Sequence, residues 1–87
     1  YFEADENYTK VHTVPGKILM ISRSIGDLEK VISPNTFFRI HRSYIVNLNF
    51  VKAFNRNDGY FVTMENGAKL DVAARRKDDL IKTLTGY

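Results

Sequence analysis

The middle of the chain reads Phe37-Phe38-Arg39-Ile40-His41-Arg42-Ser43-Tyr44-Ile45-Val46-Asn47. In its first half, Phe38 and Ile40 alternate with Arg39 and His41, which is the two-residue period of a half-buried β-strand. The pattern breaks at Arg42 and an apolar run follows, so the stretch predicts two strands joined by a loop that Arg42 leads. Aromatic and branched side chains at strand spacing usually fill a core. We expect this core to include Phe38, Ile40, Ile45 and Val46.

Further strands are predicted on both sides of this stretch. Apolar or alternating runs place them at residues 8–14, 18–21, 50–54, 60–64 and 68–70. Turn signals separate them at Pro15-Gly16, Asn57-Asp58-Gly59 and Asn66-Gly67. The chain is therefore predicted to be mostly β.

Two helices complete the expected fold. Ser24 is a good N-cap for a short internal helix over residues 25–32, which Ser33-Pro34-Asn35 ends because the residue before a proline resists the helical conformation. A second helix is predicted over residues 73–84, with Leu80, Ile81 and Leu84 on its apolar edge. Without repeats or linkers, residues 1–87 are interpreted as a single domain.

Length and composition restrict the class of protein. Eighty-seven residues, 44% hydrophobic and 26% charged, suit one small globular domain. The absence of cysteine excludes disulfide scaffolds, thiolate metal sites and cysteine nucleophiles. Apolar runs are far shorter than the about 18 residues that span a membrane, and no signal segment opens the chain. A cytoplasmic setting is expected, with no membrane contact in this fragment.

Enzyme chemistry finds no support in the residue pattern. His12 and His41 stand alone, without a second histidine at metal-ligand spacing. The five glycines are scattered, so no glycine-rich phosphate loop is present. We expect no catalysis, no cofactor and no small-molecule substrate.

The basic residues are concentrated in the second half of the chain. The net charge is only +3, but residues 33–77 carry eight basic and three acidic side chains. Such a concentration favours a polyanionic partner, while the alternative is an ordinary solvated surface.

Three of these cations, Arg75-Arg76-Lys77, fall in the first turn of the predicted final helix. That end of the helix dipole is unfavourable for cations, so the placement favours a docked phosphate. The alternative is that these side chains simply extend into water.

The central loop offers one base-reading candidate. An arginine at a strand break can present two parallel donors to guanine N7 and O6, although Arg42 could equally pair with a nearby acid at the surface. His41 is interpreted as a structural histidine, and Asn47 as a residue that satisfies a local turn.

The eleven central residues resemble the F-x-R-x-H-R-S-Y-x-V-N region of LytTR domains, the DNA-binding modules of LytR/AlgR/AgrA-type response regulators. The similarity extends to Tyr1-Phe2-Glu3-Ala4-Asp5 with Asn7-Tyr8-Thr9, to Glu65-Asn66-Gly67 and to Val72-Ala73-Ala74-Arg75-Arg76. It covers essentially the whole chain. Ala73 departs from the family pattern, which often has serine there, so an N-cap hydroxyl is missing.

The resemblance implies small antiparallel sheets in an elongated β-β-β arrangement with short helices, whose loops enter the major groove. The base-reading candidates are then Arg42, Arg75, Asn7 and Tyr8, with His41 and Asn47 holding the loop shape. From charge, the phosphate-contact candidates are Lys10, Lys52, Arg56, Lys69, Arg76 and Lys77.

The function implied is sequence-specific binding of double-stranded DNA by the output domain of a bacterial transcriptional regulator. Such a domain would follow a receiver and bind promoter direct repeats as a homodimer. Because the chain starts at Tyr1, it is expected to be a C-terminal fragment that lacks the family's first strand and leaves Tyr1-Phe2-Glu3 at an open sheet edge. The alternative function is a small β-rich protein-interaction module with a basic patch, and RNA binding is a weaker third.

Overall fold

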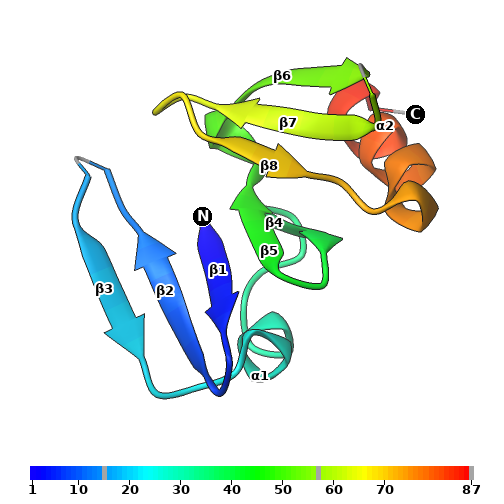
Figure 1. Cartoon of the computed structure of the whole chain (residues 1–87). Helices are drawn as coiled ribbons and strands as arrows, with labels where there is room; N and C mark the ends of the chain where they lie inside the picture. The colour runs from blue at the N-terminus through cyan, green and yellow to red at the C-terminus, as the bar shows by residue number, and fades with distance from the viewer. Residues whose placement is uncertain (15, 57, 87) are drawn as a thin grey trace.

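The computed structural model describes residues 1–14, 16–56 and 58–86, and its strands form two antiparallel sheets (Figure 1). The five-stranded sheet has the order β3-β2-β1-β5-β4 and the three-stranded sheet the order β6-β7-β8. The first sheet consists of β1 (Phe2–Asp5), β2 (Tyr8–His12), β3 (Ile18–Ile21), β4 (Phe37–His41) and β5 (Tyr44–Asn47). The second consists of β6 (Val51–Arg56), β7 (Tyr60–Met64) and β8 (Lys69–Asp71).

Four helical segments accompany the sheets in the described part of the chain. They are α1 (Ile25–Glu29), the 3₁₀ turns η1 (Leu48–Phe50) and η2 (Ala74–Arg76), and α2 (Lys77–Thr85). The α2 helix lies at the end of the second sheet, and α1 lies below β4 and β5 in Figure 1. The predicted fold class, mostly β with a short internal helix and a C-terminal helix, is confirmed.

One apolar core joins the two sheets. It contains Ile40 and Val46 from the first sheet, Val62, Met64 and Leu70 from the second, and Val72 and Leu80 from the C-terminal segment. The predicted burial of Ile40, Ile45 and Val46 is confirmed, and Phe38 packs half-buried against this core. The molecule measures 33 × 25 × 23 Å along its principal axes.

Several strand boundaries differ from the prediction. The strand predicted over residues 8–14 ends at His12, because Thr13 turns the chain by donating its backbone N–H to the carbonyl of Lys17 at 2.9 Å. The strand predicted from residue 50 starts at Val51, since Phe50 belongs to η1. The turn at Asn66-Gly67 lies where predicted, with Gly67 at φ 90°. Pro15 and Asn57, which belong to the other two turn signals, lie outside the described residues.

The expectation that Tyr1-Phe2-Glu3 borders an open sheet edge is wrong. β1 lies in the middle of its sheet, where Phe2 and Glu3 pair with β2 on one side and with β5 on the other. One partner of β1 is β2, which follows it along the chain, and the second partner is β5. The edges of this sheet are β3 and β4.

Both helices differ from their predicted ranges. Ser24 caps α1 as predicted, its Oγ accepting from the N–H of Asp27 at 3.2 Å, but the helix ends at Glu29 instead of Ile32. Its last turn tightens through three-residue bonds such as Val31 N–H to Leu28 O at 3.0 Å.

The final helix is divided in two. η2 covers Ala74–Arg76 and α2 starts at Lys77, so the prediction that Arg75 and Arg76 occupy the first turn of one continuous helix is wrong. The N–H of Arg76 donates to Ala73 O at 2.8 Å, which is a three-residue bond. Short 3₁₀ turns of this kind are common at helix starts.

Candidate nucleic-acid interface

Three connecting segments meet along one side of the fold. The N–H of Ala4 donates to Ser43 O at 2.8 Å, which puts the β1–β2 turn beside the β4–β5 turn. The N–H of Ala73 donates to Ile40 O at 2.8 Å, which puts the start of η2 on the other side of β4. In Figure 1 the three segments follow one another from the bottom of the first sheet to the start of α2. They carry the residues predicted to read bases.

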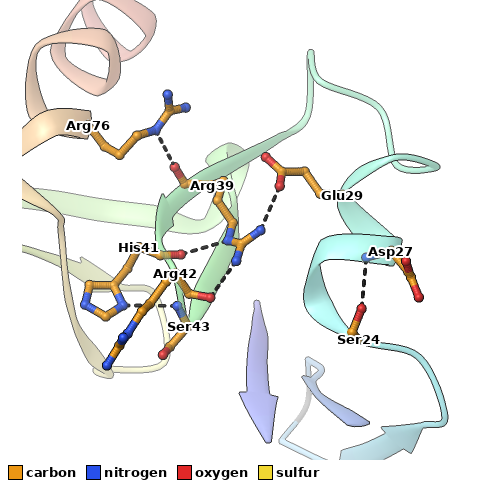
Figure 2. Close-up of polar contacts among 8 residues, drawn as sticks. All are labelled: Ser24, Asp27, Glu29, Arg39, His41, Arg42, Ser43 and Arg76. Atoms are coloured by element: carbon orange, nitrogen blue, oxygen red, sulfur yellow. Dashed lines mark hydrogen bonds and ion pairs between the residues drawn. The ribbon is translucent and has the colours of Figure 1, made fainter. Parts of the chain in front are cut away.

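The β4–β5 turn exposes Arg42. The strand register shifts between Arg39 and His41, which is the irregularity of a β-bulge and redirects the chain before the turn. The ring Nδ1 of His41 accepts from the N–H of Ser43 at 3.1 Å. Arg42 is exposed, and Figure 2 shows its side chain pointing away from Arg76.

Arg39 lies beneath this turn and was not among the predicted site residues. Its Nε donates to His41 O at 2.8 Å and its Nη2 to Arg42 O at 2.6 Å, while Nη1 donates to Glu29 Oε1 at 2.7 Å (Figure 2). The side chain is only 20% exposed. In the sequence, Arg39 stands at a strand position between the core residues Phe38 and Ile40. Its partner Glu29 lies ten residues earlier, and strand periodicity does not reveal this contact.

The η2 segment holds one exposed and one tethered arginine. Arg75 is exposed. Arg76 donates through Nε to Arg39 O at 3.0 Å, lies 4.7 Å from the ring centroid of Phe38 and has Nη1 3.6 Å from Asp79. Ala73 caps η2 without a side-chain hydrogen bond, as its missing hydroxyl requires.

A polar hollow of about 390 Å³ separates the β4–β5 turn from η2. Its walls carry Glu29, Arg39, His41, Arg42, Ala73, Arg75 and Arg76. The structure therefore brings together Arg42 and Arg75, which are 33 positions apart in sequence. The concentration of guanidinium groups makes this side of the molecule suited to an anionic partner.

The β1–β2 turn presents Asn7 and Tyr8. Asn7 is exposed and Tyr8 is 49% exposed, and the turn bends through Glu6 at φ 57°. Lys10 follows on β2, with its Nζ 3.9 Å from Asp5 Oδ2. These polar groups lie next to the Arg42 turn.

Asn47 does not belong to this interface. It lies at the opposite end of β5 from the turn, where it pairs with Phe37. Its Oδ1 accepts from the N–H of Asn49 at 2.9 Å and caps η1. Asn47 therefore structures η1 and not the β4–β5 turn.

The predicted phosphate contacts on the second sheet and at the start of α2 fall into two groups. Arg56 pairs with Tyr60 at the start of β7, and Lys77 Nζ donates to the Tyr60 hydroxyl at 3.0 Å. This hydrogen bond lowers the pKa of Tyr60 and raises the pKa of Lys77. Lys52 and Lys69 are exposed at the other end of the sheet, where Lys69 pairs with Thr63. Only the first group lies next to the arginine side, the surface that carries Arg42, Arg75 and Arg76.

Among the described residues, no group of three histidine, cysteine, aspartate or glutamate side chains is placed to hold a metal ion. No helix among them has the length and apolar character needed to cross a membrane.

Comparison with known proteins identifies several similar regulatory proteins. Over 69 residues, 78% of the chain, it is 42% identical to the CO-responsive transcriptional regulator RcoM of Rhodospirillum rubrum. It is 36% identical to the transcriptional regulatory protein LytR of Staphylococcus aureus and 30% identical to the sensory transduction protein LytT of Bacillus subtilis, each over 74% of the chain. The aligned segments span 29%, 26% and 27% of those proteins, so the chain corresponds to less than a third of each.

A solved structure shares the fold over nearly the whole chain. It is the LytTr DNA-binding domain of a Bacillus cereus protein described as a methyl-accepting/DNA response regulator. The match covers 99% of this chain and 79% of that one, with a TM-score of 0.79 and 26% identity. The sequence pattern of the LytTr DNA-binding domain family also matches residues 1–85. The chain therefore belongs to the LytTr DNA-binding domain family, whose members include domains of bacterial transcriptional regulators.

Proposed function

We propose that this domain binds double-stranded DNA in a sequence-specific manner by inserting its connecting segments into the major groove. The observation that carries the proposal is that Arg42 and Arg75 are both exposed and line one polar hollow between the β4–β5 turn and η2. Arginine is the side chain that most often reads guanine in the major groove, through N7 and O6.

Each segment has a separate role in this proposal. Arg42 and Arg75 read bases from the β4–β5 turn and η2, and Asn7 and Tyr8 read bases from the β1–β2 turn. The phosphate contacts proposed from charge are Lys10, Lys52, Arg56, Lys69, Arg76 and Lys77. Arg76 and Lys77 already have protein partners, so a phosphate would share their remaining donors with Asp79 and Tyr60.

The wider setting rests on the relatives. LytR and LytT are named as transcriptional regulatory and sensory transduction proteins, which supports a response-regulator type of parent with this domain at its output. We include in the proposal a cytoplasmic location, a receiver domain that precedes the chain, and binding as a homodimer to promoter direct repeats.

Protein binding is a second candidate because of one observation. The edge strand β3 exposes Ile18, Leu19 and Met20 by 53–58% each, and exposed apolar edge strands favour pairing with another chain. This surface is separate from the arginine side, so the two functions are compatible.

Fluorescence anisotropy on a duplex selected from a random library tests the proposal. The domain is titrated against the selected and a scrambled duplex at roughly 50 and 200 mM salt, a range over which phosphate-dominated binding weakens steeply. We expect preference for the selected duplex to persist at the higher salt. Equal affinities that both vanish at the higher salt would leave only a basic surface. No binding at the lower salt would favour the protein-interaction function.

A further inference from the structure

We propose that Arg39 is a positioning residue that fixes the conformation of the β4–β5 turn, and that Glu29 of α1 orients it. The effect of Arg39 on DNA recognition rests on the proposed function. Its effect on the turn is a property of the protein alone. The two can therefore be measured separately.

The guanidinium of Arg39, a residue of β4, connects this strand to the β4–β5 turn and to α1. Its Nε and Nη2 donate to two consecutive carbonyls, His41 O at 2.8 Å and Arg42 O at 2.6 Å. One rigid planar group thus sets the orientation of both peptide planes at the turn. The third nitrogen donates to Glu29 Oε1 at 2.7 Å, a charge-assisted bond that fixes the plane of the fork from the opposite side.

The backbone of Arg39 connects the second base-reading segment. Its carbonyl accepts from Arg76 Nε at 3.0 Å, and Arg76 also lies over Phe38. Arg76 directly follows Arg75 in η2. The Arg39 side chain therefore fixes the turn of Arg42, while its carbonyl, which every substitution keeps, helps to hold the segment of Arg75.

This arrangement assigns different roles to two arginines of one stretch. Arg39 has a guanidinium nitrogen in each of three hydrogen bonds and is only 20% exposed, so its donors are directed inward. Arg42 is exposed beside it. Lysine cannot replace Arg39 because its single ammonium does not reproduce the rigid fork.

The first arm of the test uses the protein without DNA. Arg39→Gln, Arg39→Lys and Glu29→Gln are compared with wild type and with Arg23→Gln, a matched control that removes the same charge from an exposed arginine. Circular dichroism identifies folded variants, and backbone ¹⁵N relaxation reports on Arg42 and Ser43. We expect order parameters at the turn to fall from about 0.85 to below about 0.6 in Arg39→Gln, and less in Glu29→Gln. If Arg39→Gln does not fold, Arg39→Lys and Glu29→Gln decide, and an unchanged rigid turn in both would overturn the proposal.

The second arm measures recognition on the selected duplex and its base-substituted versions. We expect Arg39→Gln to reduce the ratio of selected to scrambled affinity by about 5- to 150-fold, the discrimination that one bidentate base contact supplies. The lost preference should concern the base pair read by Arg42, while that read by Arg75 remains. In an Arg42→Ala background, Arg39→Gln should change the ratio by less than about twofold.

The outcomes separate the two proposals. If Arg39→Gln weakens selected and scrambled duplexes equally, as Arg23→Gln would by charge alone, Arg39 is not a positioning residue for recognition. If the wild type prefers no sequence, the proposed function fails, and the relaxation data still decide whether Arg39 fixes the turn.

Discussion

Arg39 and Arg42 stand three positions apart in the same stretch, but they differ in burial. The Arg39 side chain is mostly buried, whereas Arg42 is exposed. Arg39, before the bulge, donates to backbone carbonyls of the turn, whereas Arg42, after it, is exposed to solvent. A period-two pattern indicates which strand positions face the core. It does not specify that an arginine will bond to the turn that follows it. This is why sequence alone identified Arg42 as a site residue and omitted Arg39.

Arg42→Ala tests base reading at the level of one side chain. We expect it to weaken binding to the selected duplex by about 1–3 kcal/mol and to relax the preference at one base pair. Anisotropy with duplexes substituted at each position measures both effects. Lys77→Ala is the comparison, because loss of a phosphate contact should weaken selected and scrambled duplexes alike. An equal loss on both duplexes for Arg42→Ala would contradict base reading by this residue.

The hydrogen bond between Lys77 and Tyr60 predicts an unusual alkaline titration. The bond lowers the pKa of Tyr60, so the folded protein releases this proton before the unfolded chain does. The pair therefore gains stability as pH rises towards the ordinary tyrosine pKa of about 10, and loses it as pH rises through the raised pKa of Lys77.

Phenolate absorbance measures this titration directly. The difference between wild type and Tyr60→Phe isolates Tyr60 from the other tyrosines, and in Lys77→Gln its pKa should rise towards the ordinary value. Lys69→Gln, a charge removed from the far end of the sheet, is the control. A Tyr60 titration that is the same in Lys77→Gln and wild type would contradict the pairing.

The helix starts of this fold differ in how they are capped. Ser24 caps α1 through its hydroxyl, whereas Ala73 at the start of η2 offers no side-chain acceptor. The backbone of Ala73 is extended, at φ −62° and ψ 137°, which is the usual conformation of an N-cap residue. We expect Ala73→Ser to stabilise the domain by about 1 kcal/mol, measured by urea denaturation. Ala74→Ser, one residue inside the turn, is the control and should not stabilise it.

How far the elements could be predicted depended on whether their determinants are local. The cap at Ser24 and the apolar runs of β4, β5 and β7 were correctly predicted, since each depends on adjacent residues. The central place of β1 could not be predicted locally, because its partner β5 lies some 40 positions further on. The start of η2 likewise involves a tertiary contact, the bond from the N–H of Ala73 to Ile40 O.

The single apolar core makes the stability of each sheet depend on the other. Leu80 of α2 is fully buried among residues of both sheets. Leu80→Ala should lower the free energy of unfolding by about 2–5 kcal/mol, a large share of the about 4–13 kcal/mol typical for this length. Leu84→Ala, one turn later and 38% exposed, is the control with a smaller expected loss. Amide exchange should show β2 and β7 losing protection together, and loss confined to one sheet would contradict a shared core.

The dimensions of the molecule bear on the extent of the DNA contact. Its long axis of 33 Å is close to one turn of B-DNA, about 34–36 Å. Lys77 of α2 adjoins η2, and Lys52 and Lys69 lie at the far end of the second sheet, so these three lysines sample how far along the molecule a duplex makes contact. Each phosphate contact contributes about −0.9 to the slope of log K against log salt.

We therefore expect Lys52→Gln, Lys69→Gln and Lys77→Gln each to reduce the magnitude of that slope by about 0.9, measured by anisotropy over a series of salt concentrations. These variants neutralise one charge each and nearly preserve side-chain size. They also divide the surface, because Lys77 adjoins η2 whereas Lys52 and Lys69 lie at the far end of the sheet. An unchanged slope for Lys52→Gln and Lys69→Gln alone would confine the duplex to the side formed by the β1–β2 turn, the β4–β5 turn and η2. An unchanged slope for Lys77→Gln as well would exclude the start of α2, together with Lys52 and Lys69, from the phosphate contacts.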